Sequence, residues 1–169
     1  MSEELRAELE KYLQNLNIQT NCVEHPAVFT VEQMMPHLEG VSGAVSKNLF
    51  LKDKKKKGLW LVSARHDRQV NLNDLAKKLG VGSGNLRFAD EAIMVEKLKV
   101  GQGCATALSL MFDKEQSVKF VLDRDLVEGE HEMVYFHPMT NTASMGLKRD
   151  DLLRFLKETG HEPILQSFD

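Results

Sequence analysis

Apolar residues recur along the first part of the chain with the period of a helix. Within a mostly polar segment, one helix face collects Leu5, Leu9, Tyr12, Leu13 and Leu16. This pattern predicts an amphipathic helix over residues 2–16. Further helices are predicted over residues 71–80, 89–98 and 148–160.

Shorter apolar runs of the β type lie between these helices. They cover residues 19–25, 46–52, 59–64, 117–123, 132–137 and 143–147. The second and third runs flank the polar tip "DKKKKG" and predict a hairpin. Because strands and helices do not alternate regularly, a doubly wound parallel sheet is disfavoured. We expect one α+β domain over residues 1–169, a mixed, largely antiparallel sheet or partial barrel surrounded by helices.

Turn and capping signals mark the ends of several elements. Thr30 with Gln33 three residues later fits a capping box, so a short helix should follow and be disturbed near Pro36. Asn71 is a candidate N-cap. Gly80 and Gly160 end the helices that precede them.

Composition and charge narrow the function classes. The chain has 169 residues, of which 42% are hydrophobic and 28% charged, with a net charge of −3. Binding to nucleic acid would therefore need a local basic patch. Two cysteines without CxxC spacing favour a reduced compartment over a disulfide scaffold or zinc site. With no apolar run long enough for a membrane helix and no signal-peptide core, a cytoplasmic protein without membrane contact is expected.

The lysines between residues 47 and 57 are expected to have different roles. The run Lys54–Lys57 lies at the hairpin tip, where charge solvates a turn, although a basic tip could also touch an RNA backbone. Lys47 follows the small residues "GVSGAVS" and begins a strand. It could project into a pocket and hold an anion, or it could be an ordinary surface lysine.

Two other segments have the composition of a binding site. "VGQGCATAL", residues 100–108, is a small-residue loop between a helix and a strand, which a ligand could approach closely or which could be a tight, packed turn. "YFHPMTNTAS", residues 135–144, gathers His137 and Asn141 with two threonines at the end of a strand. These groups could line a site or satisfy the backbone of a turn.

Five segments together resemble a known family. They are "HPAVFTVEQ", "SKNLFLKD", "LRFADEAIMVEKLKVGQGCATAL", "VLDRDL" and "FHPMTNTASMGLKRDDLLRFLKETGHEP". Their order from His25 to Pro163 resembles the YbaK/ProX family of aminoacyl-tRNA deacylases. The last segment is most similar to the freestanding, ProXp-ala-like members associated with prolyl-tRNA synthetase, which remove alanine wrongly attached to proline tRNA.

This resemblance implies roles for particular residues. The family's essential lysine, thought to hold the phosphate-bearing 3′ end of the tRNA, matches Lys47 and is followed by Asn48. The family's GxxxP loop, expected to grip the aminoacyl group, matches Gly103, Cys104, Ala105, Thr106 and Ala107. His137 matches a histidine near the substrate pocket, and Met34 or Met35 could face that pocket, because the family places a short helix beside it. Ala107 departs from the motif proline, which would fix φ and remove a donor.

The implied substrate is an ester between an amino acid and a terminal ribose. Its hydrolysis needs a positioned water and a stabilised oxyanion rather than a protein nucleophile. We find no GxSxG elbow, and Cys104 is expected to pack rather than react. Lys52, Arg65 and Arg87 are candidate contacts to the acceptor end of aminoacyl-tRNA, although surface ion pairs would explain both arginines equally well.

Three functions remain open at this point. The first is a trans-editing deacylase for Ala-tRNA(Pro), with prolyl-tRNA synthetase as a possible partner. The second is a tRNA- or synthetase-binding module with little activity, which the Ala107 departure favours. The third is a deacylase for another small amino acid such as cysteine. No cofactor or metal is expected, and His25 and His161 are expected in turns or at the surface.

Overall fold

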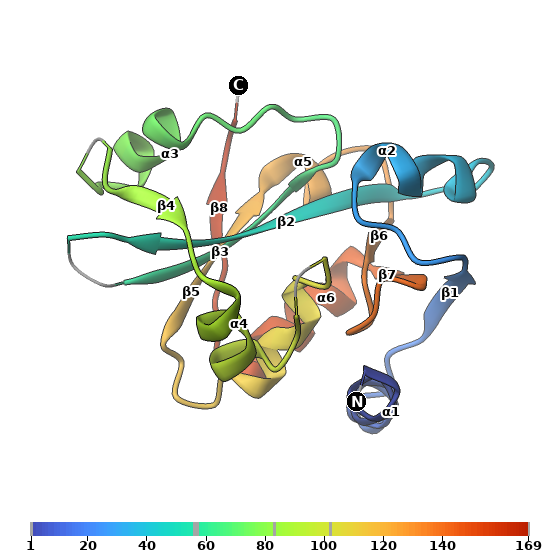
Figure 1. Ribbon diagram of the computed structural model, residues 1–169. Helices are drawn as coiled ribbons and strands as arrows, with labels where there is room; N and C mark the ends of the chain where they lie inside the picture. Colours follow the sequence, from blue (N-terminus) through green and yellow to red (C-terminus); the bar gives the residue numbers. More distant parts are fainter. Residues whose placement is uncertain (1, 56–57, 83, 102, 169) are drawn as a thin grey trace.

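Strand β2 (Ala44–Asp53) is the element on which the sheet is organised. The structure, a computed structural model, describes residues 2–55, 58–82, 84–101 and 103–168. The sheet order is β1-β7-β6-β2-β3-β5-β8, and β4 pairs with β2 beside this path. The pairs β1–β7, β6–β7, β2–β3 and β2–β4 are antiparallel, whereas β2–β6, β3–β5 and β5–β8 are parallel. The predicted mixed sheet with helices around it is confirmed (Figure 1).

The described elements have the following bounds. The strands are β1 (Thr20–Glu24), β2 (Ala44–Asp53), β3 (Leu59–Arg65), β4 (Leu86–Phe88), β5 (Val118–Asp123), β6 (Met133–Phe136), β7 (Ala143–Lys148) and β8 (Ile164–Gln166). The helices are α1 (Ser2–Asn15), α2 (Val31–Met34), α3 (Leu72–Leu79), α4 (Glu91–Leu98), α5 (Arg124–Val127) and α6 (Arg149–Thr159), with 3₁₀ helices η1 (Met35–Leu38) and η2 (Ala107–Phe112).

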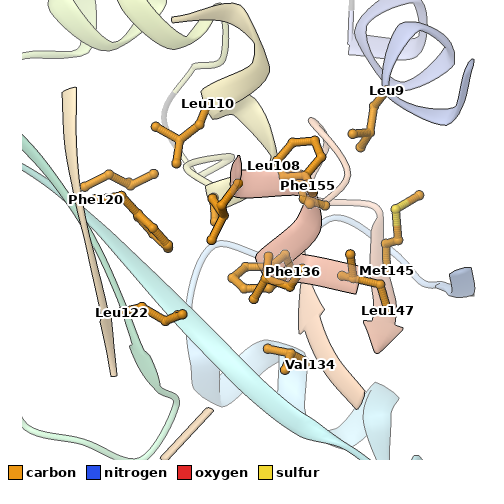
Figure 2. Close-up of a cluster of buried hydrophobic side chains, with 14 of the residues drawn as sticks. Leu9, Leu108, Leu110, Phe120, Leu122, Val134, Phe136, Met145, Leu147 and Phe155 are labelled. Atoms are coloured by element: carbon orange, nitrogen blue, oxygen red, sulfur yellow. The ribbon is translucent and has the colours of Figure 1, made fainter. Parts of the chain in front are cut away.

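The larger core lies on one face of the sheet, against α1, α4, η2 and α6. Figure 2 shows Leu108 and Leu110 of η2 and Phe155 of α6 above the strand residues Phe120 and Phe136. A second cluster packs α3 against the opposite face through Leu75 and Leu51, and a third holds α2 and η1 over Tyr135. Buried side chains thus hold helices against both faces of the sheet.

Local signals placed several caps correctly. Thr30 Oγ1 accepts the backbone N–H of Gln33 at 3.1 Å, as expected for a capping box. Asn71 Oδ1 accepts the N–H groups of Asn73 and Asp74. Gly80 and Gly160 end α3 and α6 at φ +76° and +80°, where glycine carries no Cβ penalty.

Three sequence-based expectations need correction. Lys47 lies inside β2, which begins three residues earlier at Ala44, and not at the mouth of a strand. The 100–108 segment does not run directly into a strand, because η2 begins at Ala107. Neither His161 nor His25 is at the surface: the His161 side chain is 1% exposed and pairs with Asp113, and His25 is buried with Nε2 3.0 Å from Ser144 Oγ. Of the tip lysines, Lys56 and Lys57 lie outside the described residues.

Candidate substrate pocket

A pocket opens where β2 changes partners on one of its edges. β6 pairs with β2 at Ala44 and Val45, and β4 pairs with it from Leu51 to Asp53. Between these points β2 lines a hollow of about 170 Å³. The lining residues are Val28, Phe29, Thr30, Val31, Met34, Ser46, Lys47, Asn48, Gly103, Ala105 and His137. The pocket lies between α2, β2 and the segment that follows α4, and the course of these elements can be followed in Figure 1.

Lys47 brings the pocket's ammonium group. Its Nζ donates a hydrogen bond to the carbonyl oxygen of Arg68, which leaves two N–H donors for a ligand. Partial burial lowers the pKa of Lys47, while the carboxylates of Asp67 and Glu32 act in the opposite direction. The side chain is therefore a point charge with one fixed bond and two available donors.

The turn that holds Lys47 is itself held by a buried carboxylate. Asp123, which is 0% exposed at the end of β5, accepts the backbone N–H of Arg65 at 3.0 Å and Arg68 Nε at 3.1 Å through the same oxygen. Arg68 also contacts Asp125. Because the turn carries the carbonyl that accepts from Lys47, β5 positions the ammonium indirectly.

Asn48 belongs to a chain of hydrogen bonds along the pocket wall. Its Oδ1 accepts the hydroxyl of Ser63 on β3, and its Nδ2 donates to Ser46 Oγ at 3.4 Å. Ser46 Oγ in turn donates to the carbonyl of Tyr135 at 2.7 Å. These contacts fix the side chain that follows Lys47 against the sheet.

The apolar wall comes from the segment before α2 and from α2 itself. Val28 and Met34 are 3% and 5% exposed, so they present packed apolar surface. Phe29, in contrast, is 69% exposed at the rim. Its backbone N–H donates to Gln33 Oε1 at 2.8 Å. In a standard capping box this donor would be the N–H of the N-cap residue, Thr30, so here the bond comes from the residue before the cap. Phe29 was not among the residues selected from the sequence.

The loop opposite Lys47 contributes Gly103 and Ala105. Gly103 has φ +83°, and a Cβ there would lie 3.2 Å from Phe29 Cδ1, so a side chain would both strain the backbone and crowd the rim. Cys104 is not among the pocket-lining residues. Its backbone N–H donates to Gly101 O at 3.1 Å, and burial raises the pKa of its thiol, which does not suit a nucleophile.

Thr106 and Ala107 lie behind the loop and not in the pocket. Both are 0% exposed. Thr106 Oγ1 caps η2 by accepting the N–H of Leu108 at 3.2 Å, and Ala107 is the first residue of that helix. They therefore fix the direction in which the Gly103–Ala105 backbone faces the pocket.

His137 reaches the pocket, whereas Asn141 supports it from outside. His137 Nδ1 donates to the carbonyl of Ala143 at 3.1 Å. Burial lowers the pKa of His137, the Ala143 carbonyl opposes this, and His25 lowers it further, so the ring is neutral at pH 7 with Nε2 as an acceptor. Asn141 Nδ2 donates to the Val28 carbonyl at 2.8 Å and so holds the apolar wall.

The three candidate tRNA contacts fall in two places. Lys52 and Arg87 are directly opposite each other on β2 and β4. Lys52 also lies 3.8 Å from Asp90. Arg65 lines a separate hollow of about 310 Å³ and pairs with Asp67 and Asp125, as in the ion-pair alternative.

Neither a metal centre nor a bilayer-crossing helix is found in the part of the chain that the structure describes. Its His, Cys, Asp and Glu side chains do not gather in groups of three that could hold an ion. Its helices lack the length and apolar character needed to cross a bilayer.

The fold and the pocket together define a class of protein. Solved structures share the fold: one described as a candidate trans-editing enzyme for prolyl tRNA synthetase matches with a TM-score of 0.71 and 18% identity, over 98% of each chain. A family model for the aminoacyl-tRNA editing domain matches residues 25–155.

Curated relatives agree with that match. A prolyl-tRNA synthetase associated domain-containing protein 1 from Bos taurus is 69% identical over 166 residues, which cover 98% of this chain and 96% of the relative. The prolyl-tRNA editing protein ProX of Acetoanaerobium sticklandii is 34% identical over 150 residues, 88% of each chain. The chain belongs to the aminoacyl-tRNA editing domain family, as the resemblance indicated.

Proposed function

We propose that this protein is a trans-editing hydrolase that removes alanine from Ala-tRNA(Pro). The observation that carries the proposal is the small pocket itself, which gathers Lys47, the Gly103–Ala105 backbone and His137 around about 170 Å³. Membership of the editing family supports deacylation as the reaction class. The names of the relatives support proline tRNA as the substrate and prolyl-tRNA synthetase as a partner.

The reaction would be hydrolysis of the ester at the terminal ribose. Water attacks the ester carbonyl, the bond to the ribose oxygen breaks, and that oxygen takes the proton. The two available N–H donors of Lys47 would hold the phosphate-bearing 3′ end. The backbone N–H groups of Gly103 and Ala105 would stabilise the oxyanion, and His137 Nε2 would accept a hydrogen bond from the substrate's amino group.

Selectivity would follow from the size of the pocket. Ligand pockets for drug-sized molecules measure about 300–1,000 Å³, so this one suits a small aminoacyl group. Val28 and Met34 would pack against the methyl group of alanine. Contacts with one methyl group more or less discriminate by only ~1–3 kcal/mol. The correct product, Pro-tRNA(Pro), would therefore be protected by steric exclusion of the larger prolyl ring.

A panel of aminoacyl-tRNAs tests the proposal directly. We expect the protein to release alanine from Ala-tRNA(Pro) and to leave Pro-tRNA(Pro) intact, measured as loss of labelled aminoacyl ester with time. Faster loss of cysteine from Cys-tRNA(Pro) than of alanine from Ala-tRNA(Pro) in the same panel would instead favour a deacylase for cysteine. Tight tRNA binding without loss of any ester would instead indicate a binding module. The expected compartment is the cytoplasm, where such a tRNA is used.

Ala107 in place of the motif proline is expected to be compatible with activity. The position is the first residue of η2, where proline is favoured, and Thr106 before it has φ −158° and ψ 145°, as a residue preceding proline requires. Ala107→Pro should therefore fold and retain deacylase activity, at a cost in stability of about 1–3 kcal/mol for the larger ring at this fully buried position.

The measurement is the deacylation rate with a parallel thermal melt. If Ala107→Pro deacylates much faster than the wild type, alanine at this position impairs the natural protein. That result would favour the binding-module alternative. Ala105→Pro is the matched control, because it alters the pocket-lining part of the same loop and should lower the rate.

A further inference from the structure

The turn that follows β3 brings a backbone carbonyl back to the pocket lysine. Lys47 is directly opposite Ala64 in the β2–β3 ladder. The chain then turns after Arg65, where the N–H of Arg68 donates to the Arg65 carbonyl at 3.0 Å. The carbonyl of Arg68 accepts the hydrogen bond from Lys47 Nζ. The ammonium group on β2 is therefore held by a turn that lies outside the ladder.

Arg68 anchors this turn through its own side chain. The side chain is only 12% exposed, and its guanidinium contacts the carboxylates of Asp123 and Asp125. The other oxygen of Asp123 accepts the N–H of Asp125 at 3.0 Å, so the buried carboxylate is itself fixed. Because removing charges from water is costly, a buried ion pair is weak evidence for stability, and fixing a geometry is the alternative role that it leaves.

The guanidinium of Arg68 lies outside both neighbouring hollows. Lys47 is among the described residues that line the pocket and Arg65 among those that line the second hollow, but Arg68 is in neither set. Any effect of its side chain on a ligand in the pocket must therefore pass through the turn and its carbonyl. A lysine side chain has about 2 kcal/mol of rotamer entropy, so a fixed acceptor keeps the ammonium in one place before a substrate arrives.

We propose that Arg68 is a positioning residue for Lys47. Clamped on Asp123 and Asp125, its side chain holds the turn so that the backbone carbonyl fixes the ammonium in the pocket. The inference rests on the proposed function, because the exact position of the ammonium affects catalysis only if Lys47 contacts the substrate. In that case a displacement of about 1 Å costs roughly 10²-fold in rate.

The test compares Arg68→Ala and Arg68→Lys with the wild type. Arg68→Ala should fold, because Asp123 keeps the backbone N–H groups of Arg65 and Asp125 as donors. We expect it to lower the single-turnover deacylation of Ala-tRNA(Pro) by roughly 10–100-fold. Arg68→Lys keeps a cation beside Asp123 but lacks the planar fork that spans both carboxylates, so its loss of rate should be smaller.

A spectroscopic readout separates positioning from general destabilisation. In isotope-labelled protein at mildly acidic pH, NMR should detect the Nζ signal of Lys47, because its hydrogen bond to the Arg68 carbonyl slows exchange with water. Absence of the signal from Lys47→Met assigns it, and Arg68→Ala should lose it. Arg6→Ala is the matched control: Arg6 also bridges two carboxylates, those of Glu10 and Glu24, but it lies on α1, so this variant should keep both the signal and the rate.

The outcomes separate this inference from the proposed function. If Arg68→Ala keeps the Lys47 signal, or if the wild type shows none, the Arg68 side chain does not position the ammonium, whatever the rate. Loss of the signal with a rate equal to that of an active wild type also overturns the inference. Loss of the signal in Arg68→Ala, with no hydrolysis by any of the proteins, upholds the positioning of Lys47 and removes the editing function.

Discussion

Replacement of Lys47 by methionine is expected to lower the deacylation of Ala-tRNA(Pro) by about 10²–10³-fold, the cost of removing one preorganised donor from such a site. The side chain is held inside the pocket by its bond to the Arg68 carbonyl, and among the pocket-lining residues that the structure describes no other lysine or arginine could replace its charge. Methionine keeps the length of the stem and removes only the charge. The measurement is single-turnover ester loss with enzyme in excess.

Two companions make the Lys47 experiment specific. Lys119→Met removes an ammonium group that lies 4.9 Å from the Trp60 ring, outside the pocket, and should leave the rate unchanged. Lys47→Arg keeps the charge but places a wider, planar group in a pocket shaped for an ammonium, so we expect a rate well below the wild type. Equal rates for Lys47→Met and the wild type, with both proteins folded, would contradict the proposed mechanism.

Asp113 and His161 form a buried hydrogen-bonded pair that joins the end of α6 to the segment between η2 and β5. Asp113 Oδ1 accepts from the backbone N–H and the hydroxyl of Ser117, and Oδ2 accepts from the N–H of Val118 and from His161 Nε2. His161 Nδ1 also lies within hydrogen-bond distance of Thr159 Oγ1, at 2.9 Å, and the Thr159 hydroxyl donates to the Leu156 carbonyl. Both ring nitrogens of His161 therefore have fixed partners.

Asp113→Asn is expected to destabilise the fold by about 3–5 kcal/mol, because an amide NH₂ in place of a carboxylate oxygen leaves two buried donors without an acceptor. All four groups around the carboxylate donate, so whichever way the amide is oriented, its NH₂ faces two of them. The melting temperature should fall by about 10 °C. The measurement is urea unfolding at pH 7, with a thermal melt beside it.

The acid side of the stability curve gives an independent check. Burial by itself would raise the pKa of Asp113, but the bonds from His161, Val118 and Ser117 outweigh it and lower the pKa below 3.8. Because the pKa of Asp113 is lower in the folded than in the unfolded protein, its carboxylate contributes its full stabilisation at any pH above the unfolded pKa. This contribution is lost as the pH falls through the folded pKa. The difference between wild type and Asp113→Asn should therefore shrink from pH 7 toward pH 3.

A surface carboxylate provides the matched control. Asp151 pairs with Arg154 at 3.2 Å on one turn of α6, and Asp151→Asn should cost less than about 1 kcal/mol. If Asp113→Asn were no more destabilising than Asp151→Asn, the buried pair would not stabilise this junction.

The long elements and their caps were predictable because local chemistry specifies them. Helical periodicity placed α1, α3, α4 and α6, and the Thr30 and Asn71 caps were read from short patterns. β4 and β8 were missed since each has three residues and is stabilised by pairing with β2 or β5. No periodic signal exists in so short a run.

The candidate site was predictable only as separate pieces. The resemblance selected Lys47, Gly103, Ala105, His137 and Met34, all of which line the pocket. Phe29 and the Arg68 carbonyl were missed, because a backbone acceptor and an exposed rim side chain carry no sequence pattern of their own. Thr106, Ala107 and Asn141 turned out to lie behind the pocket surface, where they orient the loop and the apolar wall.

By itself, the sequence determined the kinds of element, the mixed sheet and the family, because periodicity, capping residues and ordered motifs are local properties of the chain. Only the tertiary structure decided where the pocket opens, since that depends on β2 exchanging β6 for β4 along one edge. It also decided that His161 is a buried partner of Asp113 and Phe88 an exposed ring, because burial is a property of neighbours far apart in the sequence.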